Sequence, residues 1–149
     1  DEVDPEQLFS MLALVRQEFD CVLVDLPADW SGWALSVALA SDQVLLVTEL
    51  SVAGLRQARR RLDLFSSIGV ADDAVRIVVN RVERKLFRPI GIDEAGEVLG
   101  KPVTATLADE DDAMNSAQNE GHLITDVHRH CKFGSDIEAL ARAMQAKGR

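Results

Sequence analysis

One stretch of the sequence places an acidic residue at the end of a buried-strand pattern. Residues 21–24 are Cys, Val, Leu and Val, apolar on both faces of a strand, and Asp25 follows them. Strands that are buried on both faces belong mostly to parallel sheets, and open α/β sheets bind ligands at the carboxyl ends of their strands. A carboxylate at that position can hold Mg²⁺ beside phosphate groups, or it can cap the turn that follows. The pattern alone favours neither interpretation.

The elements that would position this acid alternate along the chain. Besides residues 21–26, buried strands are predicted at 44–48, 75–79 and 103–107. Apolar residues at helical spacing predict helices at 5–19, 31–40, 52–68, 93–99, 109–120 and 135–146. Gly69 and Gly100 stand where helices commonly end. Strands that alternate with helices predict a Rossmann-like, three-layer α/β domain with a mainly parallel sheet of these four strands.

Composition limits the classes of function. The 149 residues fit one domain, and the net charge of −9 argues against a role based on attraction to nucleic-acid phosphates. No apolar run approaches the roughly 20 residues that cross a bilayer. Two cysteines, Cys21 and Cys131, are too few for a disulfide framework. A reducing cytoplasm is the expected setting, and the first residue, Asp1, favours a fragment or a processed chain.

Several segments resemble, in order, the ParA/MinD type of P-loop ATPase. Residues 19–27 are similar to the second-switch strand of that family, which ends in Asp-x-Pro. The matching segments that follow are 41–48, 51–56, 78–82, 107–109 and 117–121. The Trp30-Ser31-Gly32-Trp33 run and residues 54–60 are similar, more narrowly, to the CpaE/TadZ branch of pilus-assembly and polar-localisation ATPases. The resemblance covers about residues 4–146 and implies that 1–149 form the C-terminal part of a single ATPase domain.

The resemblance also implies a base-binding site. Asn80 would hydrogen-bond the adenine edge, a task that suits a carboxamide because it offers a donor and an acceptor together. Arg81 would flank the base, and the backbone of Leu107, Ala108 and Asp109 would complete the pocket. Ala108 stands where the family usually has proline. Without the resemblance, Asn80 is better explained as a turn residue at a strand end.

The phosphate-binding loop is absent from the sequence. A P-loop needs Gly-x-x-x-x-Gly-Lys-Ser/Thr between a strand and a helix, and the nearest match, Gly96 to Pro102, is one residue short and lacks the hydroxyl. The resemblance implies that this loop lies upstream of Asp1, and that its strand lies between the strands ending at Asp25 and Thr48. Those two strands are therefore expected either to pair directly or to leave a gap. Asp25 would be the catalytic and Mg²⁺-side carboxylate of the intact protein.

Two further clusters are better explained without a ligand. Four possible metal ligands occur in one short stretch: His122, His128, His130 and Cys131. They lack the spacing of known zinc motifs, so we expect a polar loop rather than a metal site. Four arginines could form a basic patch for DNA: Arg56, Arg59, Arg60 and Arg61. A solvated helix face, with Arg59 and Asp63 paired, is the preferred interpretation.

These features lead to one main hypothesis and two alternatives. The main hypothesis is the nucleotide-binding part of a CpaE/TadZ-like protein, an ATP-dependent homodimerisation switch that acts with pilus or secretion machinery in the cytoplasm, at the pole or the inner face of the membrane. ATP and Mg²⁺ would bind the intact protein, and this chain alone is expected neither to bind ATP tightly nor to hydrolyse it. The alternatives are a non-catalytic interaction module with a degenerate nucleotide site, and a ParA-like partition ATPase that binds DNA.

Overall fold

The computed structural model describes residues 4–28, 31–83 and 90–145. Its strands are β1 (Val44–Glu49), β2 (Val75–Val82) and β3 (Val103–Ala108). Its α-helices are α1 (Pro5–Glu18), α2 (Gly32–Ala40), α3 (Val52–Ile68), α4 (Ile92–Leu99), α5 (Asp111–Glu120), α6 (Ile124–Val127) and α7 (Lys132–Gln145), and a short 3-10 helix, η1, spans Asp72–Ala74.

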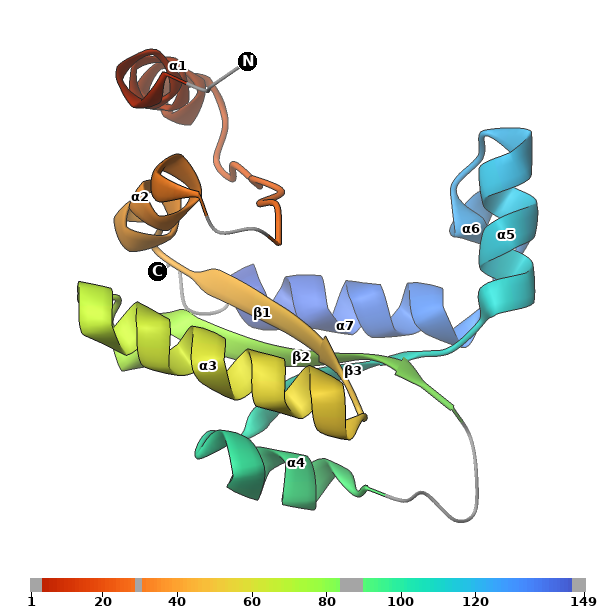
Figure 1. Ribbon diagram of the computed structural model, residues 1–149. Helices are drawn as coiled ribbons and strands as arrows, with labels where there is room; N and C mark the ends of the chain where they lie inside the picture. Colours follow the sequence, from red (N-terminus) through yellow and green to blue (C-terminus); the bar gives the residue numbers. More distant parts are fainter. Residues whose placement is uncertain (1–3, 29–30, 84–89, 146–149) are drawn as a thin grey trace.

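The three strands form a parallel sheet in the order β1-β2-β3. Helices α3 and α4 cover one face of this sheet, and α7 covers the other (Figure 1). The larger core lies between the sheet and the α3–α4 layer, where Phe65 and Ile77 are fully buried. A smaller core, built around Val78 and Leu107, lies under α7. The predicted three-layer α/β domain with a parallel sheet is therefore confirmed.

The predicted helix ends agree well with the structure except at α7. Gly69 and Gly100 have positive φ values of 91° and 67°, the left-handed conformation that glycine adopts without strain, and they end α3 and α4. Helix α7 begins at Lys132, three residues before the predicted start. The carboxylate of Glu110 accepts hydrogen bonds from the backbone amides of Lys132 and Phe133. This tertiary cap supports an extra turn that the local sequence does not indicate.

The predicted strand at residues 21–26 is wrong. These residues form no strand, and their side chains alternate between exposed and half-buried positions rather than being buried on both faces. Leu23 is 86% exposed. A strand forms only when a neighbour satisfies its backbone groups, and no strand lies beside this segment in the part of the chain that the structure describes. Of the two outcomes expected for it, the structure therefore contains the gap.

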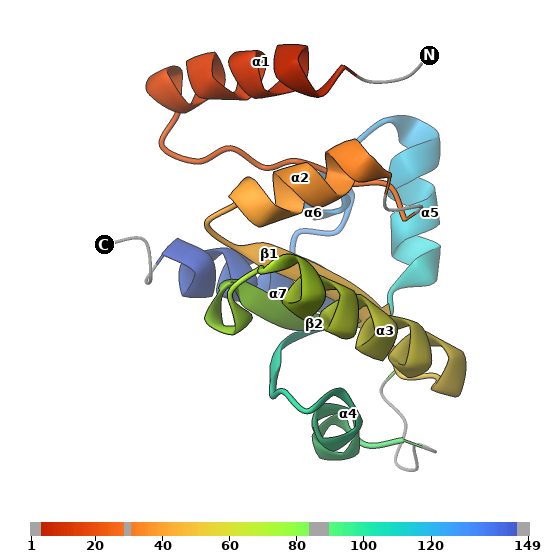
Figure 2. The same cartoon turned by 60° about the vertical axis from the view of Figure 1, so that its left-hand side comes forward.

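Helix α1 is weakly attached to the rest of the molecule. It contains no buried residue, and it packs on α2, apart from the sheet (Figure 2). Arg16 of α1 forms an exposed ion pair with Asp42 at 3.2 Å. None of the described helices combines the length and apolarity needed to span a membrane.

Replacing Gly54 with alanine is expected to lower the free energy of unfolding by about 1–3 kcal/mol, although alanine is the better helix former. A Cβ at Gly54 would lie 2.9 Å from the carbonyl oxygen of Glu49, so the first turn of α3 would have to move away from the end of β1. Gly96→Ala is the matched control. Its Cβ would make an ordinary van der Waals contact, 3.4 Å from the nearest oxygen. An increase of about 1 kcal/mol in the free energy of unfolding is therefore expected. Urea denaturation measures both, and a gain at Gly54 would contradict the close approach.

Candidate functional site

The carboxyl ends of the strands bring most of the predicted site residues together. Asn80 of β2 is paired with Glu49 of β1, and Ala108 of β3 is paired with Val82 of β2. Because the strands are parallel, these ends lie along one edge of the sheet. Asn80 and Arg81 are therefore neighbours of residues 107–109 along this edge.

Arg81 connects three elements at this edge. Its φ of 54° is unusual for a residue other than glycine, and its backbone amide donates to Oδ1 of Asn80 at 2.9 Å. Its guanidinium group forms long ion pairs with Glu49 of β1, at 3.8 Å, and with Asp111 of α5, at 3.9 Å. A strained backbone that presents a charged side chain at strand ends is typical of binding sites.

Asp109 closes the other side of this edge. Its backbone amide donates to the carbonyl oxygen of Val82 at 3.2 Å, which holds the residue after β3 beside β2. Its Oδ1 atom is buried without a hydrogen-bond partner among the described residues. Loss of solvent raises the pKa of Asp109 above its ordinary value, and the negative charges of Asp111 and Glu83 raise it further. The site thus contains a carboxyl oxygen with an unused acceptor position.

Replacing Asp109 with asparagine is expected to raise the melting temperature at neutral pH. The pKa of Asp109 is higher in the folded chain than in the unfolded one, so folding disfavours its charged form. This unfavourable contribution develops as the pH rises from the unfolded pKa through the folded one, and it is fully present above the folded pKa. In acid below pH about 3, where the carboxyl is protonated in both states, the variant and the starting chain should melt alike. Thermal melts at both pH values measure the difference, and a gain of equal size in acid would contradict the assignment.

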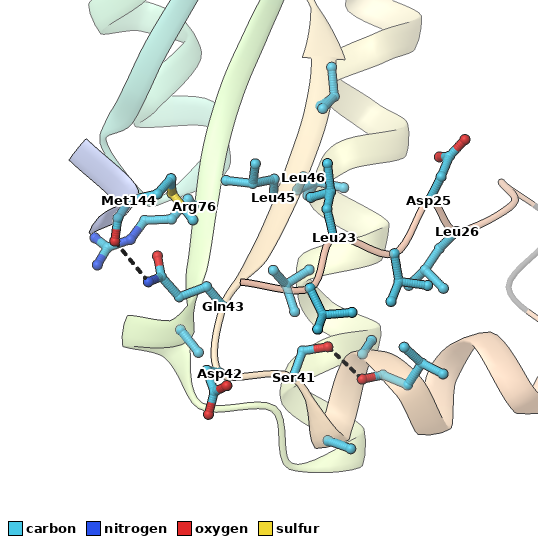
Figure 3. Close-up of a pocket in the computed structure, with 18 of the residues that line it drawn as sticks. Leu23, Asp25, Leu26, Ser41, Asp42, Gln43, Leu45, Leu46, Arg76 and Met144 are labelled. Carbon is cyan, nitrogen blue, oxygen red and sulfur yellow. Dashed lines mark hydrogen bonds between the residues drawn. The ribbon is translucent and has the colours of Figure 1, made fainter. Parts of the chain in front are cut away.

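A large open groove lies on the far side of β1 from β2. Residues 19–26 and 28 form one wall, and β1 with α3 forms the other (Figure 3). Its lining is largely apolar and includes Leu23, Val24, Leu46, Val47 and Ala58. The groove volume of about 2880 Å³ exceeds the range of roughly 300–1,000 Å³ that is usual for small-molecule pockets. Its size and apolar lining fit a segment of polypeptide better than a nucleotide.

Asp25 lies across this groove from the sheet. It is exposed, and its carboxylate points away from β1 (Figure 3). The segment that carries it is held to α3 by Arg61, whose Nη2 donates to the carbonyl oxygen of Ala28 at 2.8 Å. Leu26 packs against the larger core. The structure therefore gathers Asn80, Arg81 and residues 107–109 at the sheet edge and leaves Asp25 on the opposite wall of the groove.

Two residues of this region were missed by the sequence analysis. Glu49 follows the apolar run of β1 after one intervening residue, Thr48, so a strand-plus-acid pattern with that spacing would have identified it. Asp136 of α7 accepts a hydrogen bond from the amide of Ala108 at 3.1 Å. No local pattern marks Asp136, because the contact joins residues that are far apart in the sequence. Within the described residues, His, Cys, Asp and Glu side chains form no group of three or more suited to a metal ion.

The chain is similar to MinD proteins and to a ParA family ATPase. It is 30% identical over 125 residues to the septum site-determining protein MinD of Bacillus subtilis, a match that covers 82% of this chain and 46% of MinD. A ParA family ATPase from Chlorobium tepidum superposes with a TM-score of 0.85 at 23% identity, over 93% of this chain and 57% of that one. MinD of Aquifex aeolicus, in a complex with MinC, gives a TM-score of 0.81 at 20% identity, over 97% and 60%.

No family model matches the chain. The chain spans about half the length of the curated relatives that it matches. The sequence match to MinD and the structural matches point to similar proteins, and each covers most of this chain. This chain is therefore similar in sequence to about half of MinD, and similar in fold to MinD and a ParA family ATPase.

Proposed function

We propose that this chain is the base-side part of an ATP-binding switch domain of the MinD/ParA type. The observation that supports this most is the meeting of Asn80, Arg81 and residues 107–109 at one edge of a parallel sheet. The same residues are the ones that the family resemblance assigns to the adenine pocket. The phosphate cradle would come from polypeptide that is not in this sequence.

The chemistry of the sheet edge fits a purine base. Oδ1 of Asn80 already accepts a bond from Arg81, so its Nδ2 group is the donor that a ring nitrogen would meet. The buried, unpaired Oδ1 of Asp109 would accept a hydrogen bond from an exocyclic amino group, as adenine carries. An unsatisfied buried acceptor is unfavourable until such a donor binds. Arg81 could stack its planar guanidinium group on the base.

The groove beside β1 would receive the strand that carries the phosphate-binding loop. A strand seated there would pair with the open edge of β1 and give residues 21–26 the neighbour that they lack. The acid at the end of that segment, Asp25, would then stand at the same sheet edge as Asn80. In that arrangement Asp25 would help to hold Mg²⁺, which prefers carboxylates, waters and phosphate oxygens as ligands.

The cellular role that we propose is an ATP-dependent homodimerisation switch of the CpaE/TadZ type, which works with pilus or secretion proteins on the cytoplasmic side of the membrane. This finer assignment rests on residues 30–33 and 54–60; Trp30 lies outside the described residues. One similar structure is a complex of MinD with MinC, which supports a protein as the partner. A scaffold that has lost nucleotide dependence is the alternative if no ATP binds.

A DNA-binding role is a second candidate because one similar structure is a ParA family ATPase. The arginines of α3 give this DNA-binding role little support, because two of them are bonded to other parts of the chain. Arg59 donates to the carbonyl oxygen of Leu99 and pairs with Asp63, both at 3.0 Å, and Arg61 is bonded to Ala28. Arg56 and Arg60 remain as exposed cations of this group. Salt-sensitive DNA binding that is lost when both are neutralised would establish this role instead.

Nucleotide binding by a fusion tests the main proposal. The part of Bacillus subtilis MinD outside the 125 matched residues would be joined to this chain, a protein that we call the MinD fusion. We expect Mg²⁺-dependent ATP binding by the fusion and none of comparable strength by this chain. Asn80→Ala should weaken binding by up to roughly tenfold, the effect of one hydrogen bond, and Asp25→Asn should weaken its Mg²⁺ dependence. ATP turnover by this chain alone that survives Asp25→Asn would defeat the proposal.

A further inference from the structure

The N-terminal part of α7 is bonded to the segment that ends β3. Oδ2 of Asp136 accepts a hydrogen bond from the backbone amide of Ala108 at 3.1 Å. In the opposite direction, the Glu110 carboxylate accepts bonds from the amides of Lys132, at 2.9 Å, and Phe133, at 3.4 Å. Each of the two chain segments thus supplies a carboxylate to the backbone of the other.

These bonds lie where the sheet itself gives little support. The pairing of β2 with β3 is irregular between Val79 and Val82, just before Val82 meets Ala108. The amide of Ala108 is bonded to a side-chain acceptor from α7 instead of to a strand. Beyond β3, the amide of Asp109 reaches Val82, and Glu110 reaches α7. Residues 108–110 are held on the β2 side and on the α7 side.

Burial and charge strengthen these bonds. The side chain of Asp136 is 13% exposed, and its other oxygen, Oδ1, forms an ion pair with Nζ of Lys132. A carboxylate acceptor makes a stronger hydrogen bond than a neutral one, and partial burial limits competition from water. The Glu110 carboxylate lies at the N-terminus of α7, where the unpaired amides and the helix dipole favour negative charge.

Helix α7 is also fixed at its other end. Nε2 of Gln43, the residue before β1, donates to the carbonyl oxygen of Met144 at 3.3 Å. Between the two ends, Phe133, Leu140 and Met144 pack on the smaller core. A helix fastened at both ends and packed along its length is a rigid reference for the segment bonded to it.

We propose that Asp136 and Glu110 are positioning residues, which use α7 to hold the backbone of residues 108–110 in the conformation that lines the base pocket. The consequence for nucleotide rests on the proposed function. The positioning itself does not depend on it and is measurable in this chain without nucleotide. Neither residue needs to touch a ligand, because both act through the backbone of the segment after β3.

Amide hydrogen exchange of this chain tests the proposal. Asp136→Ala is expected to speed exchange at Ala108 by about tenfold or more, the effect of losing a hydrogen bond to a charged acceptor. Asp136→Asn keeps an acceptor oxygen and should hold the rate within about threefold of the starting chain. Exchange at Ile77, in the centre of the sheet, should not change in either variant. Glu138→Ala is the matched control, because Glu138 lies on the same helix but pairs with Arg142 in solvent.

Three results would overturn the proposal. Unchanged exchange at Ala108 in Asp136→Ala would show that the bond does not hold this backbone. A uniform rise that includes Ile77 would show a general loss of stability instead of local positioning. If Asp136→Ala fails to fold, Glu110→Ala replaces it and should speed exchange at Lys132 and Phe133; unchanged rates there would also overturn the proposal. If the MinD fusion without any substitution binds no ATP while local exchange changes as expected, the result would count against the proposed function alone.

Discussion

Replacing Phe65 with alanine is expected to lower the free energy of unfolding by about 3–5 kcal/mol. Phe65 is 1% exposed and lies on the face of α3 that packs against the sheet, within the larger core. Alanine would remove most of the side chain and leave a cavity, because close-packed neighbours relax only in part. A loss of this size is a large share of the roughly 5–15 kcal/mol that stabilises a typical domain. Urea denaturation followed by circular dichroism measures the change.

Phe19→Ala is the matched control for Phe65→Ala. The two variants lose the same atoms, but Phe19 is 64% exposed in the groove wall. Its replacement is expected to change the free energy of unfolding by no more than about 0.5 kcal/mol, as for most surface substitutions. Equal losses for the two phenylalanines would contradict the description of the groove as an open, poorly packed face.

Leu23→Ala is expected to have almost no effect on the stability of this chain and a large effect in the MinD fusion. Leu23 is 86% exposed in the groove, so its truncation here should cost no more than about 0.5 kcal/mol. A strand seated between residues 21–26 and β1 would cover this side chain. Its truncation should then cost about 2–5 kcal/mol, the range for a buried leucine. Denaturation of the four proteins, two of them with the substitution, measures the difference.

Leu123→Ala separates burial in the groove from other effects of the fusion. Leu123 is 70% exposed, and it lies beside α5 and α6, outside the residues that line the groove. Its replacement should be close to neutral in this chain and in the fusion alike. If Leu23→Ala changes the free energy of unfolding of a folded fusion as little as Leu123→Ala does, the groove does not receive the strand that we propose carries the phosphate-binding loop.

The sequence predicted the elements whose cause is local. The run of β1 is apolar on both faces, β2 and β3 are rich in apolar residues, and the helices carry apolar residues at helical spacing and end at glycines such as Gly69 and Gly100. These strands and helices form in the folded chain because the neighbours that each of them needs are present in the same sequence. The parallel order of the sheet then follows from the helical connections between strands.

The failures have a non-local cause. Residues 21–26 carry a strand pattern as strong as that of β1, yet a strand also needs a partner, and the pattern says nothing about whether one is present. The same limit applies to the site. Asn80 and Arg81 were placed correctly at a strand end, whereas Asp136 was missed because its bond to Ala108 depends on how α7 lies on the sheet. Asp25 was assigned to the end of a strand that this chain does not form by itself.

The positioning of residues 108–110 links the fold to the proposed function. Their backbone would form a wall of the base pocket, and it is bonded both to α7 and to the end of β2. The half of the site that we propose for the base is therefore formed within this chain. By contrast, the groove wall that carries Asp25 contacts α3 and the larger core only near its end, at Ala28 and Leu26, and no strand lies beside it among the described residues. A strand that fills the groove is expected to bury the wall that carries Asp25 and to leave the backbone of residues 108–110 as it is.

Photolabelling with 8-azido-ATP tests the central claim most directly, because it identifies the polypeptide that contacts the base. The MinD fusion would be irradiated with the analogue and Mg²⁺ and digested with trypsin, with excess ATP as competitor. Residues 86–129 form one tryptic peptide, because prolines follow Arg88 and Lys101, so tandem mass spectrometry would locate the labelled residue within each peptide. We predict ATP-protected labelling at or beside Asn80 or residues 107–109. Labelling confined to the MinD-derived part, or to residues of α5 and α6 beyond residue 111, would show that these strand ends do not form the base pocket.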